Sequence, residues 1–245
     1  MTSWPDSRWT AAQATIISVL ILGAGLQVSA ELARAFAVGS GFGETGDLHR
    51  PTTTEAASTL AALAGFQATV VALTLLVSCV SGSRPAAALM LRRPADGARI
   101  VATALLGLGA FALIYSAIAF SIDRSAVAGD LAPAIALIRS EHGLAALIVL
   151  GVGAPLAEEL LFRGFLYPAL SKSRLGPAVA AMVSTLGWTA LHAGYSIFGL
   201  VEVFLIGLYF CWLLVCTGSL WVPILCHGVY NTTLALGLKW LPISL

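Results

Sequence analysis

The chain has 245 residues, of which 58% are hydrophobic and only 10% are Asp, Glu, Lys or Arg. Soluble domains carry about 25% charged residues, so this composition predicts a polytopic membrane protein in contact with membrane lipids. A formal net charge of +1, with no basic patch interleaved with aromatic residues, excludes a nucleic-acid partner. The four cysteines show no C-x-x-C spacing, so neither a zinc knot nor a disulfide framework is indicated.

Apolar runs separated by polar segments predict an all-α bundle of about seven transmembrane helices. The runs cover residues 11–38, 59–80, 100–122, 144–170, 175–193, 197–216 and 220–238. The first run is longer than the apolar region of about 7–15 residues in a signal peptide, so an uncleaved first span is expected. Residues 39–58 and 123–142 are expected to form loops. The apolar piece 131–138 in the second loop is too short to cross a core of ~30 Å and is expected at the membrane interface.

The predicted spans divide the chain into two parts that we expect to pack as one integrated domain. Residues 1–143 would contribute about three spans, and residues 144–245 about four. Seven crossings would place the two ends of the chain on opposite sides of the membrane. Lysine and arginine are more frequent in the loops on the amino-terminal side, which favours a cytoplasmic N-terminus by the positive-inside rule.

The stretch 153–164, G-A-P-L-A-E-E-L-L-F-R-G, places charged side chains inside an apolar run. Each charge in hydrocarbon costs about 2.5–3.5 kcal/mol even on a lenient insertion scale, so such residues are candidates for a functional site. Glu159 and Arg163 are four residues apart and can form an ion pair on one helix face, whereas Glu158 points about 100° away. Pro155 is expected to kink or open the helix and to free a carbonyl one turn earlier.

Two later segments supply further polar side chains. His192 ends the segment W-T-A-L-H, and alone it could equally be a satisfied interfacial histidine. The last run opens with T-G-S-L-W-V-P, a turn followed by a proline in the first helical turn, and then places His227 and Asn231 on one face. These two side chains could join helices by hydrogen bonds or could donate N–H groups to a developing oxyanion. The Glu159–Arg163 pair, likewise, could support a site or could only lock two helices together.

Convergence of these side chains would create a polar cavity within the membrane. In one interpretation Glu158 and His192 activate a water molecule, with the carboxylate as general base. In the other, Glu158, His192 and His227 bind a metal ion such as zinc, which takes these ligand types. The sequence contains no H-E-x-x-H motif, so the usual helical zinc-protease arrangement is absent.

The motifs taken together resemble the CPBP intramembrane protease family, which includes CAAX prenyl endopeptidases and bacterial Abi-type membrane proteases. The resemblance rests on E-E-x-x-x-R at 158–163, aromatic-x-x-x-H at 188–192 and T-G-S-L-W-x-P-I-x-x-H-x-x-x-N at 217–231. An F-x-x-G element at 204–207 adds to it. The match extends over about a third of the chain. Trp188 stands where the family usually has phenylalanine.

This resemblance implies an intramembrane endopeptidase with residues 144–245 as its catalytic core. It assigns activation of the attacking water to Glu158 and His192, and stabilisation of the oxyanion to His227 and Asn231. The family has been discussed both as metalloproteases and as glutamate-dependent proteases, so zinc held by the glutamate and the two histidines remains one alternative.

The resemblance further implies that Glu159 and Arg163 support the site. The substrate would be a membrane-associated peptide or a lipidated protein, and the location a prokaryotic inner or plasma membrane. Two other functions are compatible with the sequence: a catalytically inactive immunity or scaffold protein of the same fold, and a small proton-coupled transporter that uses intramembrane carboxylates. Glu202, inside the sixth run, is expected to form an interhelical hydrogen bond or to lie at the interface.

Overall fold

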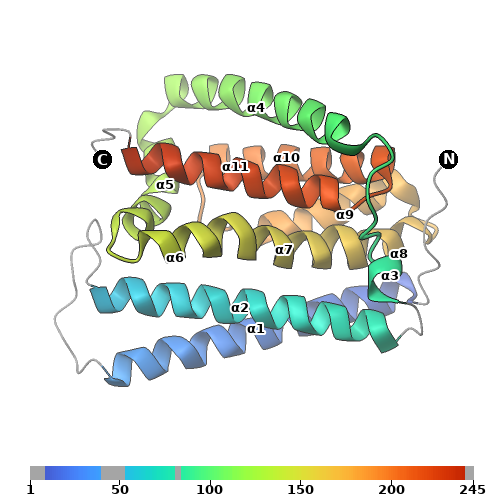
Figure 1. Ribbon diagram of the computed structural model, residues 1–245, viewed down its shortest axis with the longest axis horizontal. Helices are drawn as coiled ribbons and strands as arrows, with labels where there is room; N and C mark the ends of the chain where they lie inside the picture. The colour runs from blue at the N-terminus through green and yellow to red at the C-terminus, as the bar shows by residue number, and fades with distance from the viewer. Residues whose placement is uncertain (1–8, 40–52, 81–83, 241–245) are drawn as a thin grey trace.

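A computed structural model describes residues 9–39, 53–80 and 84–240, and the described residues form an all-helical bundle (Figure 1). Its α-helices are α1 (Ala11–Gly39), α2 (Thr53–Val80), α3 (Pro85–Ala88), α4 (Gly97–Ile122), α5 (Arg124–Arg139), α6 (Gly143–Ile148), α7 (Ala154–Glu158), α8 (Tyr167–Ser171), α9 (Gly176–Ala190), α10 (Ile197–Thr217) and α11 (Trp221–Trp240). Two π-helical segments, η1 (Val149–Gly153) and η2 (Glu159–Leu166), lie between α6 and α8. The predicted all-α fold is confirmed.

Five stretches within the described residues are long and apolar enough to cross a membrane. They are Ala11–Ala37, Thr53–Val80, Gly97–Ile122, Gly143–Ser171 and Ile197–Thr217. The protein is therefore an integral membrane protein. Helix α9 has 15 residues and at 1.5 Å per residue reaches only about 22 Å. The hydrophobicity of α11 is lowered by His227, Asn231 and two threonines. Seven crossings, the two-part division of the chain and its orientation stay predictions.

The continuous helix from Gly143 to Ser171, made of α6, η1, α7, η2 and α8, lies between α2 and α11 (Figure 1). Its second half is almost wholly buried, and the apolar side chains of Leu160, Leu161, Phe162 and Phe165 belong to the main hydrophobic core. The start of α1 and the end of α11 lie at opposite ends of the bundle (Figure 1). This arrangement buries the charged stretch at the centre of the molecule.

The expected loop at 123–142 is wrong, because most of it is the helix α5. Asp123 caps this helix by accepting a hydrogen bond from the backbone N–H of Ala126. That bond and one from the hydroxyl of Ser125 hold the pKa of Asp123 below its ordinary value. At the other end of α5, Arg139 donates two hydrogen bonds to the carbonyl of Leu238 in α11. The sequence signal that the loop interpretation overlooked is the N-cap aspartate.

Two further boundaries differ from those expected. Helix α2 begins at Thr53 rather than at residue 59, so the end of the expected loop 39–58 is helical, and residues 40–52 of that loop lie outside the described residues. Helix α9 ends at Ala190, so His192 lies in the following turn. The start of α11 is as expected, with Gly218 in the left-handed conformation (φ 60°) that glycine tolerates and Pro223 in the first helical turn.

Candidate active site

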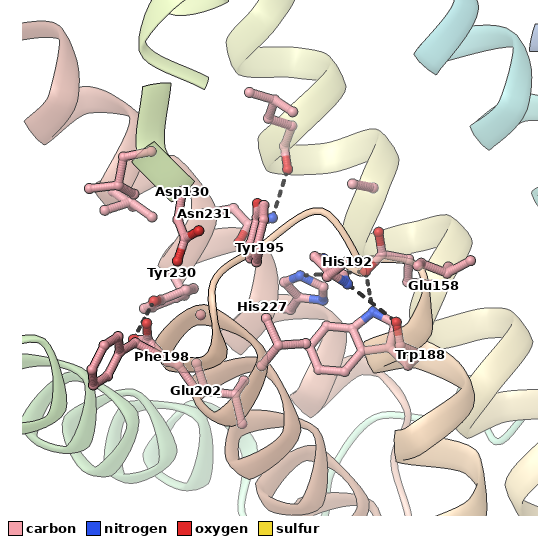
Figure 2. A pocket seen from close by; sticks show the side chains of 18 of the residues that line it. Asp130, Glu158, Trp188, His192, Tyr195, Phe198, Glu202, His227, Tyr230 and Asn231 are labelled. Carbon is pink, nitrogen blue, oxygen red and sulfur yellow. Dashed lines mark hydrogen bonds and ion pairs between the residues drawn. The ribbon is translucent and has the colours of Figure 1, made fainter. Parts of the chain in front are cut away.

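A cavity of about 440 Å³ opens among α1, α2, α4, α5, the Gly143–Ser171 helix and α9 to α11. The side chains of all four predicted catalytic residues line it, namely Glu158, His192, His227 and Asn231. Figure 2 shows the first three of them gathered around the indole of Trp188, with Asn231 farther along the cavity. The rest of the wall is mostly apolar, with leucine, valine and phenylalanine side chains from several helices.

Glu159 and Arg163 form the predicted ion pair at the centre of the bundle. Arg163 Nη1 lies 3.1 Å from Glu159 Oε1, and both side chains are fully buried. Burial of one charge without its partner would be strongly destabilising, so each of these residues requires the other. The pair forms within the π-helical segment η2, and a π-helical segment of this kind is frequent at functional sites.

The Arg163 guanidinium is enclosed by aromatic rings and one carbonyl. It lies 4.3 Å from the ring centroid of Trp188 and 5.7 Å from that of Phe210, close enough for cation–π attraction. Its Nη2 donates to the carbonyl of Gly207 in α10 at 3.3 Å. A Cβ atom at Gly207 would lie 2.8 Å from Arg163 Nη2 and 2.8 Å from the Trp188 ring. Glycine is therefore required at the F-x-x-G position for α10 to approach the pair.

Glu158 points away from Arg163, as the sequence predicts, and contacts α9 and α11 instead. The indole Nε1–H of Trp188 donates to Glu158 Oε2 at 2.5 Å. His227 Nε2 lies 3.9 Å from the same oxygen. A phenylalanine at position 188 could not donate this bond, so the tryptophan gives this chain a polar contact to its candidate general base.

His227 lies between the two glutamates. Its Nδ1 is 3.0 Å from Glu159 Oε1, and its Nε2 faces Glu158. Because Glu159 is also paired with Arg163, we treat it as an ionised carboxylate, which only accepts hydrogen bonds, and the hydrogen of this bond then lies on Nδ1 of His227. The ring is 95% buried and packs at 5.2 Å from the centroid of Phe210. Glu159 therefore fixes the orientation in which His227 presents its other nitrogen to the cavity.

His192 enters the cavity from the turn after α9. Its Nδ1 lies 3.2 Å from the carbonyl of Trp188, one helical turn earlier. The ring packs edge-on against Trp188 at 5.4 Å and against Tyr195 at 5.4 Å between ring centroids. These contacts leave Nε2 as the nitrogen available to a ligand in the cavity.

Asn231 satisfies a carbonyl that Pro155 leaves without a backbone donor. In η1 the N–H of Ala154 bonds to the carbonyl of Val149, five residues earlier, so the next bond in this register would join residue 155 to Leu150. Pro155 has no N–H, and Asn231 Nδ2 donates to the Leu150 carbonyl at 3.0 Å instead (Figure 2). The expected opening of the helix at Pro155 is confirmed, and one N–H of the Asn231 amide is committed to it.

The metal-binding alternative lacks a ligand set in this arrangement. Among the residues that the structure describes, no three His, Cys, Asp or Glu side chains are placed to hold a metal ion together. Glu158, His192 and His227 share the cavity, but they do not form such a group. We therefore assign no chemical step to a metal ion.

Residues 140–233 match the family model described as Type II CAAX prenyl endopeptidase Rce1-like. This region of the chain belongs to the Rce1-like family. The match confirms the resemblance drawn from the motifs. It includes the residues expected to form the site: Glu158, Glu159, Arg163, His192, His227 and Asn231. No curated protein and no solved structure matches the chain.

The cavity also contains polar residues that sequence reasoning did not assign to the site. Tyr230 donates its hydroxyl to Glu202 Oε1 at 3.1 Å, which confirms the expected interhelical hydrogen bond of Glu202. Asp130 accepts bonds from the backbone N–H and the hydroxyl of Ser196, both at 2.6 Å. Gln67 reaches the cavity from α2, outside the Rce1-like region. None of these belongs to a motif, and of these residues only Glu202, a charge inside an apolar run, was singled out by the sequence.

Proposed function

We propose that this protein is an intramembrane endopeptidase that hydrolyses a peptide bond of a membrane-associated peptide or a lipidated protein. One observation carries the proposal: His227 lies 3.0 Å from Glu159 and 3.9 Å from Glu158, inside a cavity that His192 and Asn231 also line. The Rce1-like match supplies the reaction class, because the family is described as an endopeptidase.

In the proposed reaction Glu158 is the general base. A water molecule between Glu158 and His192 attacks the carbonyl carbon of the scissile bond and transfers a proton to the Glu158 carboxylate. The carbonyl electrons move to oxygen and give a tetrahedral oxyanion. When the C–N bond breaks, the proton passes from Glu158 to the departing amine, so the products are a carboxylic acid and an amine. Proton transfer by a positioned side chain contributes about 10²–10⁴-fold to such reactions.

Stabilisation of the oxyanion falls to His227 and Asn231. Asn231 retains a second amide N–H beside the one that binds Leu150. His227 faces the cavity through Nε2, and because its Nδ1–H is bound to Glu159, it donates from Nε2 to the oxyanion as the doubly protonated ring. Donors fixed in advance are effective, because they need no reorganisation when the charge develops. Glu159 holds His227, and the Leu150 carbonyl, which Pro155 leaves free, holds Asn231, so both donors are supported by the same helix that carries Glu158.

The proposal extends to the membrane arrangement. We infer that α9 and α11 complete a set of seven crossings, with a cytoplasmic N-terminus in a prokaryotic inner or plasma membrane. The apolar cavity wall, including Leu63, Phe66 and Phe198, suits a substrate with apolar side chains or a lipid chain.

The test is cleavage of internally quenched peptides of randomised sequence, with and without a farnesylated cysteine, by the purified protein in detergent. We expect cleavage by the parental protein and none by Glu158→Gln or His192→Ala. A proton-coupled transporter would cleave nothing, and in vesicles its Glu158→Gln variant would lose a transport current that depends on membrane potential. A scaffold protein would also cleave nothing, and both variants would keep its cellular activity.

A further inference from the structure

Gln67 of α2 is a buried side chain whose amide has no hydrogen-bond partner within the described part of the chain. It is 93% buried, and its carboxamide bonds to none of the residues that the structure describes. A buried amide that makes no hydrogen bond destabilises the fold, and most buried polar groups in proteins are paired. Its presence in an apolar helix therefore calls for a ligand or a water molecule as partner.

The carboxamide of Gln67 lies in the wall of the candidate active-site cavity. Gln67 lines the same cavity as Glu158, His227 and Asn231. A Cβ atom added at Gly153 would lie 2.1 Å from Gln67 Oε1 and 3.0 Å from its Cδ, so the amide rests directly on the backbone of η1. Gly153 precedes Glu158 by little more than one helical turn. Contact with this backbone holds the amide against the helix that carries the candidate general base.

The chemistry of a free carboxamide indicates its ligand. The group has N–H donors and an oxygen acceptor and carries no charge, which complements the N–H and C=O of a peptide unit. The other carboxamide in the cavity wall, Asn231, has already committed one N–H to Leu150. A cationic ligand would instead favour the carboxylates of Glu202 and Asp130, which line other parts of the cavity wall.

We propose that Gln67 binds the main chain of the substrate, at a peptide unit next to the scissile bond. This inference rests on the endopeptidase function proposed above. Gln67 is a substrate-binding residue in this account and takes no part in proton transfer. It lies outside the Rce1-like match at 140–233, so the amino-terminal helices contribute to substrate recognition as well as to the fold.

The experiment compares Gln67→Leu with Thr74→Val in the quenched-peptide assay. Thr74 is the matched control, because it is a fully buried residue of α2 whose hydroxyl also lacks a partner among the described residues, yet it does not line the cavity. For Gln67→Leu we expect a loss of kcat/KM of about tenfold, as for one hydrogen bond, mainly through KM. We expect the Tm to stay the same or to rise. Thr74→Val should keep the parental kcat/KM.

A second measurement identifies the substrate atom. A cleaved peptide is remade with an ester oxygen in place of each main-chain N–H in turn, outside the scissile bond. One ester should reduce cleavage by the parental protein and have no further effect on Gln67→Leu. If Gln67→Leu kept the parental kcat/KM, this inference would be overturned and the endopeptidase function would stand. The same follows if Gln67→Leu lowered the Tm and each ester reduced cleavage by Gln67→Leu as much as by the parental protein. Absence of cleavage by the parental protein would instead overturn the endopeptidase function on which it rests.

Discussion

The indole N–H of Trp188 donates to Glu158 Oε2 at 2.5 Å. The same indole ring covers the Arg163 guanidinium at 4.3 Å, so one side chain touches both the candidate general base and the buried ion pair beneath it. Glu158 can therefore be oriented by α9 while Glu159 is held by Arg163. This arrangement separates the chemical role proposed for Glu158 from the supporting role proposed for its neighbour.

Trp188→Phe should reduce kcat about tenfold or more with little change in KM, because it removes a hydrogen bond to a charged group and keeps a ring over Arg163. Steady-state kinetics on a cleaved peptide measure the effect. Trp188→Leu, which also removes the ring, should in addition lower the Tm. A parental kcat in Trp188→Phe would show that the indole N–H does not position Glu158.

Arg163→Met should destabilise the protein by about 3–5 kcal/mol, because it leaves Glu159 ionised and buried without its cation. Thermal unfolding in detergent should show a large fall in Tm. The double variant Glu159→Gln/Arg163→Met removes both charges and should regain most of the lost stability. If the double variant is no more stable than Arg163→Met, the pair is not the coupled unit described here.

Gly207→Ala should lower both stability and activity. The added methyl would lie 2.5 Å from Thr185 Cγ2 and 2.8 Å from Arg163 Nη2, and such overpacking costs about 1–3 kcal/mol. Gly109→Ala is the control, since nothing lies within 4 Å of a Cβ atom at that position in α4. We expect Gly109→Ala to match the parental protein in Tm and in cleavage rate. Equal behaviour of the two variants would argue against close packing of α10 on Arg163.

Pro155→Ala should reduce kcat by up to about 10²-fold, the effect that a displacement of about 1 Å can have at a catalytic group. The new N–H of residue 155 can bond to the Leu150 carbonyl, and Asn231 then loses the acceptor that positions it. Pro133→Ala, at a proline inside α5, should change kcat little. Similar losses in both variants would point to a general effect of proline removal.

The sequence predicted those parts of the site that depend on local spacing. The i, i+4 pair of Glu159 and Arg163, the opening at Pro155 and the turn before α11 follow from covalent geometry and helical period, and the structure contains all of them. Trp188 as a donor to Glu158 depends on how α9 packs against the central helix, which no local rule gives. Gln67 is the one carboxamide in the mostly apolar helix α2 and belongs to no motif.

The bounds of the elements show the same limit. Residues 175–193 form one apolar run, but α9 ends at Ala190 and the chain turns at His192. The apolar piece at 131–138 is too short for a span, yet it is helical because Asp123 caps α5 and Arg139 ties its end to α11. Hydropathy recognises long apolar runs, whereas these elements are set by caps and by tertiary contacts.

The most direct test of the central claim compares Glu158→Gln with Glu31→Gln in the peptide-cleavage assay. Glu31 is an exposed carboxylate that pairs with Arg34 on α1, so its variant controls for loss of one negative charge. The account predicts that Glu158→Gln lowers kcat by at least about 10²-fold, the contribution of a general base, while its Tm stays close to the parental value and Glu31→Gln cleaves normally. Parental cleavage by Glu158→Gln would contradict the account.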